Sequence, residues 1–584
     1  MGIISRFPGG GGSPGDYPYN VSSFSASALD DTVTLTWTDP EDAAWAGTKI
    51  IRKVGAYPED VTDGVQIMDS KTKNQYQTTG LADAGLADGV TYYYQAFPYS
   101  DNGVSNNVVN RVSATPEYIY PSAMAAFAAQ AGNQKAKLVF TLPGDATGVK
   151  VVYKAGGYPA SKTDGSVIAS AVSGQEITGL TNDTAYYFRA FPFNNYGRYN
   201  EATEGNQSTC TPVATQSYGV QWAFNNSSPA LTRLGAAAPF AAPVPAVGTG
   251  AGSSPFDACL PWSGIRECNV VSGVVTAYKG DANFSRTAAD VMVEIPKFWY
   301  KCTNNAATSK REWWIADGPA DGFVVHPAFI RGGVEKEHIY VGRYATSGSA
   351  NAQVSKSGVM HLVDITRAAF RGSSATTGAK QKGAGWSQWD IATWNALQML
   401  YLVEFANFNA QACIGRGYCD GNSAQIDAGG TDGMSYHTGR PAGTDGKTAV
   451  QYRWIENMWG NIWQFVDGYN INNAVHYFCT DQSKFADDTA SNYTQMGYNT
   501  TTTSEAYISA LGFDANNPWL QAPTAAAGSE TTYVTDIYYY NTGWRVLFVG
   551  GRWDYASNCG LFCWFASHNA SYASAGIGSR LLKI

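Results

Sequence analysis

The chain contains an internal repeat, and this repeat constrains its fold more than any other feature of the sequence. Residues 49–64 return as residues 150–165 with half of their positions identical, which indicates two copies of roughly 95 residues each. The first copy alternates with the period of a β-strand, because Val33, Leu35 and Trp37 share one face and the intervening threonines share the other. The sequence therefore predicts two consecutive β-sandwiches.

Composition limits the classes of partner. The chain has 584 residues, which favours several modules over one core, at roughly 150 residues per domain. Its charged fraction of 15% is low, and 13% aromatic residues and 62 glycines favour a β-rich protein. The net charge of −8 comes without any run of Lys or Arg. We therefore expect neither nucleic acid nor a membrane as partner.

The first residues and the cysteines suggest a protein made in a cytosol. Residues 1–18 form a Gly- and Pro-rich arm without a long apolar stretch after a basic start, so we expect no secretory signal. The nine cysteines are spread from Cys210 to Cys563, unlike the dense framework of a small secreted protein, and most are expected to be reduced. The apolar window at 234–247 is interrupted by prolines and is predicted to be a connector.

The pattern changes along the chain define five segments. They are a Gly-rich arm at 1–18, a first sandwich at 19–117, a second at 118–213, a connector or β-rich segment at 214–290, and a last domain at 291–584. One helix is predicted to begin near Ser387 or Asp390 and to end before Gly415 and Gly417. Its apolar stripe is wide enough to indicate burial, and it consists of Trp394, Leu397, Tyr401, Phe405 and Phe408.

The two copies resemble fibronectin type III domains over residues 19–213. The features that carry this resemblance are an early strand with a core tryptophan, Trp37, and a leucine followed closely by a Tyr-rich strand, at 86–94 and again at 180–187. The Tyr-Pro and Thr-Asp-Gly turns of both copies fit hairpin chemistry better than a ligand loop. We expect the two sandwiches to act as spacers.

Three segments near the end of the chain carry a second resemblance. They are residues 453–468, 543–553 and 576–582, which contain Glu-Asn-x-x-Gly-Asn, Gly-Gly-x-Trp and Gly-x-Arg motifs in that order. Together they resemble the C-type lectin fold branch shared by formylglycine-generating enzymes and the variable proteins of diversity-generating retroelements. The implied fold is multidomain and mostly β, with two immunoglobulin-like (fibronectin type III-like) sandwiches followed by an α+β C-type lectin domain.

Several residues of these segments are expected to be scaffold. The tryptophans supply a bulky core, although a platform for stacking sugars is the alternative for them. Gly550 and Gly551 permit a sharp bend, and the planar fork of Arg580 can donate to loop carbonyls.

Residues 552–575 are the candidate binding surface. This segment contains no Lys, Glu, Gln or Met, and the adenine-directed mutagenesis of asparagine codons in the resembled retroelement family produces none of these four. Its mixture of Tyr, Ser, Asn, Asp and Arg is also typical of antibody paratopes, although an ordinary solvated loop and strand pair remains the alternative. The family analogy places the variable side chains at Arg552, Asp554, Tyr555, Phe562, Ser567, His568, Asn569, Tyr572 and Ser574. Trp553, Gly560, Leu561, Trp564 and Ile577 are expected to be framework.

The enzymatic branch of the family provides an alternative function. Formylglycine-generating enzymes bind copper through two cysteines after the Gly-Gly turn, and the matching positions here are Tyr555 and Gly560. The pair that is present, Cys559 and Cys563, is expected to be a buried thiol pair. We expect no metal and no cofactor, since His437 and His568 lack ligand spacing. Asp427, Asp432 and Asp445 are too scattered to indicate more than a weak calcium possibility.

The resemblance implies a bacteriophage tail-fibre or receptor-binding protein without enzymatic activity. Its partners would be a host bacterial surface receptor, either protein or glycan, and other phage tail proteins through the N-terminal region. Family members are homotrimers located in the virion, synthesised in the host cytoplasm, and we expect the same here. The alternatives are an oxidase of the formylglycine-generating type and a cellular retroelement-diversified surface protein.

Overall fold

The computed structural model describes residues 18–103, 105–502 and 504–584. The chain divides into two compact units, Met1–Ala214 (unit 1) and Thr215–Ile584 (unit 2). The described residues are mostly β, as the sequence predicted. The Gly-rich arm expected at 1–18 lies outside the described residues except for Pro18.

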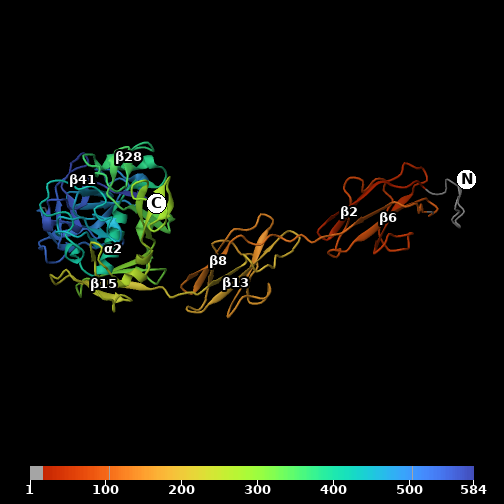
Figure 1. The fold of residues 1–584 in the computed structure, drawn as a ribbon, viewed down its shortest axis with the longest axis horizontal. Helices are drawn as coiled ribbons and strands as arrows, with labels where there is room; N and C mark the ends of the chain where they lie inside the picture. Colours follow the sequence, from red (N-terminus) through yellow and green to blue (C-terminus); the bar gives the residue numbers. More distant parts are fainter. Residues whose placement is uncertain (1–17, 104, 503) are drawn as a thin grey trace. The chain divides into compact units, whose positions relative to one another are not determined.

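Unit 1 begins with a β-sandwich (Figure 1). Within the described residues, one of its sheets has the order β1-β2-β5 and the other has the order β4-β3-β6-β7. The strands are β1 (Ser22–Leu29), β2 (Thr32–Thr38), β3 (Gly47–Val54), β4 (Val65–Ser70), β5 (Leu81–Asp83), β6 (Tyr92–Tyr99) and β7 (Arg111–Ala114).

The second copy of the repeat folds in the same way. Its sheets have the orders β12-β9-β8 and β11-β10-β13-β14, so each copy pairs a three-stranded with a four-stranded sheet, as expected of a fibronectin type III-like sandwich. The strands are β8 (Phe127–Gly132), β9 (Lys135–Phe140), β10 (Gly148–Ala155), β11 (Ser166–Ile168), β12 (Glu176–Thr178), β13 (Tyr186–Phe193) and β14 (Gln207–Cys210).

The strand alternation predicted for the first copy is confirmed. Val33, Leu35 and Trp37 all point from β2 into the sandwich core and are almost completely shielded from solvent. The indole N–H of Trp37 donates to Oδ1 of Asp39 at 2.8 Å. The one polar atom of this core residue is therefore satisfied, which limits the cost of burying it.

The turn motif that the two copies share has a structural role. In the first copy, Asp63 accepts from Lys53 at 2.6 Å and from the backbone N–H of Glu59 at 2.9 Å. In the second copy, Asp164 accepts from Lys154 at 2.8 Å and from a backbone N–H at 2.7 Å. The Thr-Asp-Gly motif thus closes the same hairpin turn twice, in agreement with the turn chemistry predicted for it.

Unit 2 is built from three larger sheets and several smaller ones. The five-stranded sheet has the order β16 (Thr232–Gly235), β15 (Ser217–Ala223), β22 (Lys310–Ala316), β21 (Trp299–Asn305) and β23 (Val324–Val325). The six-stranded sheet has the order β19 (Val274–Tyr278), β18 (Arg266–Val271), β20 (Asp290–Pro296), β26 (His338–Gly342), β42 (Leu581–Lys583) and β29 (Trp386–Gln388).

The nine-stranded sheet runs through the last part of unit 2. Its order is β35 (Thr494–Asn499), β34 (Val475–Phe478), β33 (Trp463–Asn472), β39 (Trp544–Gly550), β40 (Gly560–Ala566), β38 (Ile537–Tyr540), β36 (Ala506–Leu511) and β37 (Pro523–Ala526), and β41 (Ile577–Gly578) pairs with β33. The smaller sheets combine β17 (Ala246–Val247) with β30 (Gly439–Arg440), β31 (Gln451–Tyr452) and β32 (Ile455–Glu456), β24 (Ile330–Arg331) with β25 (Val334–Glu335), and β27 (Ser347–Ser349) with β28 (Ala352–Val354).

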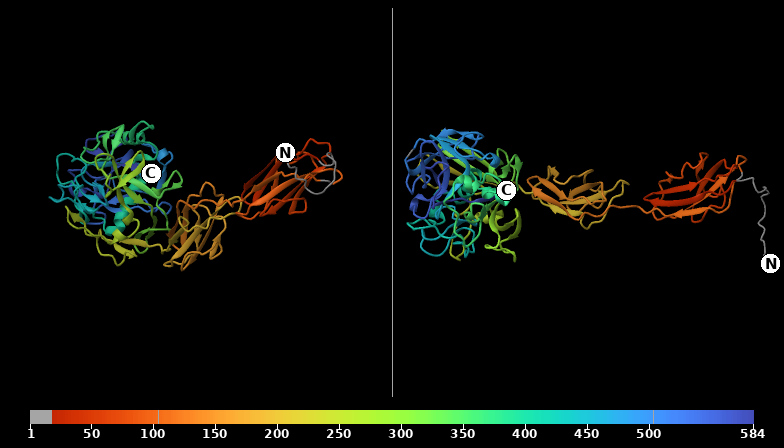
Figure 2. Two further views of the ribbon diagram at one scale, coloured as in Figure 1. Left: turned by 45° about the vertical axis from the view of Figure 1, so that its right-hand side comes forward. Right: turned by 90° about the horizontal axis from the view of Figure 1, so that it is seen from above.

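The segment at 214–290, expected as a connector or β-rich segment before the last domain, is β-rich and belongs to unit 2 together with that domain. Its strand β15 pairs along its whole length with β22, and its strand β18 pairs with β20. Figures 1 and 2 show the yellow-green segment that carries β15 against the remainder of unit 2 in every view. The boundary predicted at 290 therefore falls inside a sheet, because strand pairs distant in sequence leave no local signal at a boundary.

The predicted helix is present but shorter than expected. Helix α2 (Ile391–Phe405) is capped by Asp390, whose carboxylate accepts from the N–H of Thr393 at 2.9 Å, and every residue of the helix is buried. It ends at Ala406, which adopts a left-handed conformation, with φ at 51°. Phe408 and the end near Gly415 therefore lie outside it. The other α-helices of the described residues are α1 (Arg367–Arg371) and α3 (Ala410–Cys413).

Arg580 joins two of the three terminal segments, 453–468 and 576–582, to the end of β26. Its guanidinium is fully buried and donates to the carbonyl oxygens of Gly342 and Arg343, both at 2.8 Å. It also donates to the carbonyls of Glu456 and Asn457 at 2.7 and 3.3 Å, and to Oε1 of Gln464 at 3.0 Å. The predicted role of Arg580 as a donor to loop carbonyls is confirmed.

The Gly-Gly bend is enforced by close packing. Gly550 and Gly551 have φ angles of 90° and 82°, a region that side chains other than glycine rarely adopt. A Cβ atom on Gly551 would lie 2.3 Å from Sγ of Cys559, and one on Gly550 would lie 2.6 Å from the carbonyl oxygen of Met458. Glycine is therefore required at both positions, because the backbone conformation is unfavourable for other residues and because there is no room for a Cβ atom.

Replacement of Arg580 by Lys should destabilise unit 2 strongly. Lysine keeps the charge but cannot reproduce the planar fork, so several buried carbonyls lose their donor, at about 1–3 kcal/mol for each unsatisfied group. We expect a lower melting temperature for unit 2 in calorimetry, with unit 1 unchanged. Arg552→Lys, a partly exposed control, should cost at most about 1 kcal/mol. Equal melting curves for R580K and R552K would contradict the assigned role.

Candidate binding surface

The first part of the candidate surface, residues 552–559, is a loop between β39 and β40. Its backbone is held by residues outside the loop: the N–H of Trp553 donates to the carbonyl of Asn461 at 3.1 Å, and the N–H of Ala556 donates to the carbonyl of Cys419 at 2.8 Å. The carbonyl of Trp553 accepts from the N–H of Asn422 at 2.9 Å. The loop conformation is therefore fixed by main-chain contacts that do not involve the nominated side chains.

Three nominated side chains of this loop reach the surface. Asp554 is exposed, and Arg552, which is partly exposed, pairs with it at 2.7 Å. Tyr555 is half-buried, with its ring edge-to-face on Trp463 at a centroid distance of 5.0 Å. Burial raises the pKa of Tyr555 to about 12, so its hydroxyl stays protonated well above neutral pH.

The second part of the candidate surface is the loop at 567–575, after β40. The ring of His568 stacks on the ring of Tyr572 at a centroid distance of 3.5 Å, and burial lowers the pKa of His568. Asn569 is exposed, and its Oδ1 accepts from the N–H and the hydroxyl of Ser571 at 3.2 and 2.8 Å. The exposed residues of this loop are Asn569, Ser571, Ala573 and Ala575, and they lie next to the half-buried His568 and Tyr572.

The two serines of this loop are less available. The hydroxyl of Ser574 accepts from the N–H of Gly576 at 3.2 Å, and its carbonyl accepts from the N–H groups of Asp364 and Ile577. The hydroxyl oxygen of Ser567 is buried and has no hydrogen-bond partner among the described residues. The hydroxyl of Ser574 thus holds the local backbone, and that of Ser567 is shielded from solvent.

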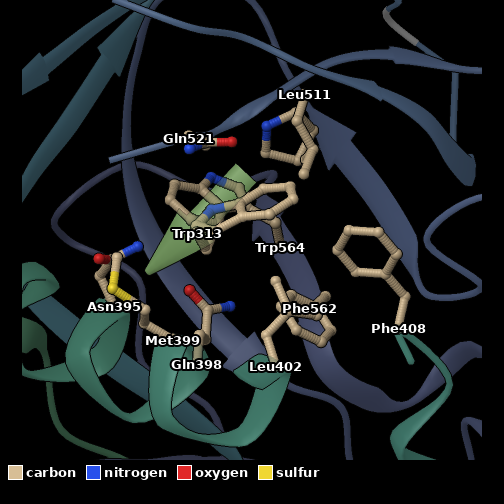
Figure 3. A pocket seen from close by; sticks show the side chains of 11 residues that line it. Trp313, Asn395, Gln398, Met399, Leu402, Phe408, Leu511, Gln521, Phe562 and Trp564 are labelled. Atoms are coloured by element: carbon tan, nitrogen blue, oxygen red, sulfur yellow. The ribbon is translucent and has the colours of Figure 1, made fainter. Parts of the chain in front are cut away.

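Phe562 does not belong to the surface, which corrects the prediction for this residue. It is 8% exposed and packs edge-to-face on Tyr401 and Phe408, at centroid distances of 6.0 and 5.2 Å. Figure 3 shows its ring next to Leu402 of helix α2, at a cavity of about 30 Å³. Phe562 and Trp564 are two residues apart on β40 and thus share one face. Strand alternation could have predicted the burial of Phe562. Trp564 was expected to be framework, and a residue two positions away on the same strand lies on the same face.

The other face of β40 connects the two loops. Cys563 and Phe565 point into a second, smaller apolar cluster that also contains Trp463 and Phe548, and Tyr555 and Tyr572 both pack against this cluster from the outside. The structure therefore brings the aromatic members of the two loops to one cluster, on the side of the sheet opposite to Phe562. We call this face the loop-side face.

Two further tyrosines on the loop-side face were not predicted. Tyr507 of β36 and Tyr539 of β38 are half-buried and pack against the same cluster. The hydroxyl of Tyr507 hydrogen-bonds that of Ser557 at 2.9 Å. The tyrosine run at 538–540 was a visible signal, but only the parallel pairing of Tyr539 with Phe565 places Tyr539 beside the loops.

The thiols of Cys559 and Cys563 are completely buried, and burial raises the pKa of both well above the usual value. A raised pKa disfavours the thiolate, which is the form that ligates soft metals. The structure describes all nine cysteines as free thiols. No cluster of three or more His, Cys, Asp or Glu side chains suited to a metal occurs in the described ranges.

The other residues considered for metals have protein partners. His437 hydrogen-bonds Asp257 at 2.9 Å through Nε2 and Thr438 at 2.8 Å through Nδ1. Asp432 accepts from Tyr344 at 2.6 Å, besides Arg343 and Ser357. These contacts give both side chains a structural role. In the part of the chain that is described, no helix is long and apolar enough to cross a membrane.

Comparisons with known proteins assign no family to this chain. No protein-family model matches the chain, and no curated protein matches it. Among solved structures, the chain is similar to a segment of two fibronectin type III domains from chicken tenascin, at 14% sequence identity and a TM-score of 0.15. That match covers 34% of this chain and 99% of the tenascin segment.

Truncation of Phe562 should test its placement in the core. Phe562→Ala removes a buried ring, which typically costs about 3–5 kcal/mol, so we expect a clearly reduced free energy of unfolding in denaturant titrations of the full chain. Asp554→Ala, in the same segment but exposed, should change it by less than about 1 kcal/mol. A Phe562→Ala variant as stable as the parent protein would contradict the placement of this residue in the core.

Proposed function

We propose that this protein is a phage tail-fibre receptor-binding protein, which adsorbs to the host through a variable surface on a C-type lectin scaffold. The observation that carries the proposal is the separation between backbone and side chains in residues 552–559. Their main chain is held by framework contacts, whereas Asp554 is exposed and Tyr555 is half-buried at the surface. Such a loop can change side chains without refolding. In residues 567–575, Asn569 and Ser574 also hold the local backbone, and Tyr572 is half-buried at the surface.

The composition of the segment supports diversification by a retroelement. The absence of Lys, Glu, Gln and Met from residues 552–575 matches the outcome of adenine-directed mutagenesis in the resembled family. With Phe562 moved to the core, the proposed variable set contains Arg552, Asp554, Tyr555, Ser567, His568, Asn569, Tyr572 and Ser574. Tyr507 and Tyr539 extend it as fixed aromatic neighbours.

The binding free energy of such a surface is expected to come mainly from a few residues, which we call anchors. A standard interface covers about 800 Å² on each partner, and its affinity is concentrated in a few aromatic or Arg residues. Tyr555 and Tyr572 are the best candidates here, because each is rigidly packed on the same apolar cluster and still reaches solvent. In a homotrimer, linked sites would raise the avidity by about 10² to 10⁴. A weak and changeable single site would then suffice.

The proposed partners follow from this assignment. The receptor would be a protein or glycan on the host bacterial surface, and the N-terminal region would attach to other phage tail proteins, with the two sandwiches as spacers. The protein would act in the virion after synthesis in the host cytoplasm.

Adsorption should depend on the aromatic anchors. The double variant Tyr555→Ala/Tyr572→Ala should lose most binding to susceptible bacteria, by about tenfold or more in a pull-down of labelled full-length chain. Because both rings lie at the edge of their cluster, its melting temperature should fall only slightly. Tyr196→Ala, which removes an exposed tyrosine of unit 1 (45% exposed), is the matched control. Equal loss of adsorption in both variants would refute the assigned surface.

An oxidase of the formylglycine-generating type is the alternative from another class. Incubation of the chain with copper and a cysteine-containing peptide should give no aldehyde, because Tyr555 and Gly560 occupy the positions of the copper ligands and the two nearby thiols resist ionisation. Aldehyde formation, detected by mass spectrometry and absent in a Cys559→Ser/Cys563→Ser variant, would replace the binding assignment with an enzymatic one.

A further inference from the structure

A second concave site lies in unit 2, away from the candidate surface. It is a pocket of about 340 Å³ at the ends of β20 and β22 and the beginnings of β21 and β26. This volume is at the lower end of the range of small-molecule sites, which is about 300–1,000 Å³. Leu260, Pro261, Pro296 and Trp299 provide apolar walls. The pocket can therefore accept an organic group of several carbon atoms.

The cations at this pocket are already neutralised. Arg266 donates to Oε1 of the buried Glu294 at 2.6 Å. Lys297 pairs with Glu337 at 2.9 Å and with Glu335 at 2.5 Å. Neither cation is therefore free to attract an anionic ligand.

Asp317 differs from the other charged groups of the pocket. Its Oδ1 accepts from the backbone N–H of Gln216 at 2.8 Å, and no Lys, Arg or His in the described ranges lies within ion-pair distance of its carboxylate. Burial raises the pKa of Asp317. The lining side chains comprise two cations, Arg266 and Lys297, three carboxylates, Glu294, Asp317 and Glu337, and the imidazole of His338. With a neutral imidazole, this leaves an excess of one negative charge.

Trp299 adds an aromatic wall, one face of which is already covered by a cation of the chain. The Nζ atom of Lys297 lies over its ring, 4.8 Å from the ring centre. The negative face of an indole attracts ammonium groups. The ring stands at the start of β21, whose first residue pairs with Ala316, directly before Asp317. The aromatic wall and the uncompensated carboxylate are thus neighbours.

We propose that this pocket binds a small organic ammonium ion, with the cationic group paired to Asp317 and the apolar body against Trp299 and Leu260. A cation would restore the charge balance of the pocket and offset the desolvation cost of the Asp317 carboxylate. A neutral saccharide would do neither. The inference is independent of the proposed function, because none of the pocket residues belongs to the candidate surface.

The test is an isothermal titration of the full-length chain with butylammonium chloride, against sodium chloride at equal ionic strength. We expect saturable binding with a dissociation constant below about 10 mM, and none for butan-1-ol or methyl α-glucoside. Asp317→Asn should weaken butylammonium binding by about tenfold, while its amide oxygen still accepts from Gln216. Asp321→Asn, on the same loop, exposed and outside the pocket, should bind like the parent chain.

Several results would overturn the proposal. One is the absence of saturable butylammonium binding, and another is equal binding of the neutral alcohol or the glucoside, which would make the site a neutral one. A third is unchanged binding in the Asp317→Asn variant. Trp299→Leu provides a second check that leaves the carboxylate in place, and it should also weaken binding. Melting temperatures of all variants, compared with the parent chain, separate loss of binding from loss of folding.

Discussion

The buried guanidinium of Arg580 is the interaction on which unit 2 depends most. Burial lowers the pKa of Arg580 to about 9, so it stays charged at neutral pH and needs its acceptors. It receives them from four carbonyls and one side-chain oxygen, contributed by β26, by the turn before β33 and by β33 itself. Since a buried charge without partners is very costly, these segments can only pack in the arrangement that satisfies it.

Further hydrogen bonds hold the turn before β33 that contains Glu456 and Asn457. The carboxylate of Glu456 accepts from the N–H groups of Gly429 and Thr431 at 2.9 and 2.7 Å. Asn461 exchanges two hydrogen bonds with the backbone of Ile426. The polar side chains of the Glu-Asn-x-x-Gly-Asn motif therefore hold irregular backbone in place through hydrogen bonds. The loop at 552–559 is attached to this motif, because the N–H of Trp553 donates to the carbonyl of Asn461. The rigidity that the proposed binding surface requires comes from this polar network as much as from the tryptophans.

Sequence reasoning reached the local features and missed those that depend on distant pairing. The alternation at Val33, the helix start near Ser387 or Asp390 and the capacity of Arg580 to donate to loop carbonyls follow from the residue types and their local pattern, and each was predicted. The end of helix α2 was not, because Ala406 takes a left-handed conformation in which its carbonyl accepts from Leu231, more than 150 residues earlier. For the candidate surface, the nominated residues lie in two loops and in strand β40, and strand parity was not applied to Phe562.

Strand β40 separates two cores, with Phe562 and Trp564 on one side and Cys563 and Phe565 on the other. No position between residues 560 and 566 is free of packing, whereas the stretches before and after it carry exposed side chains. Natural variants of this gene should therefore show a sharply divided pattern of polymorphism. Amino-acid replacements would accumulate on both flanks, and purifying selection would keep the seven codons between them nearly constant.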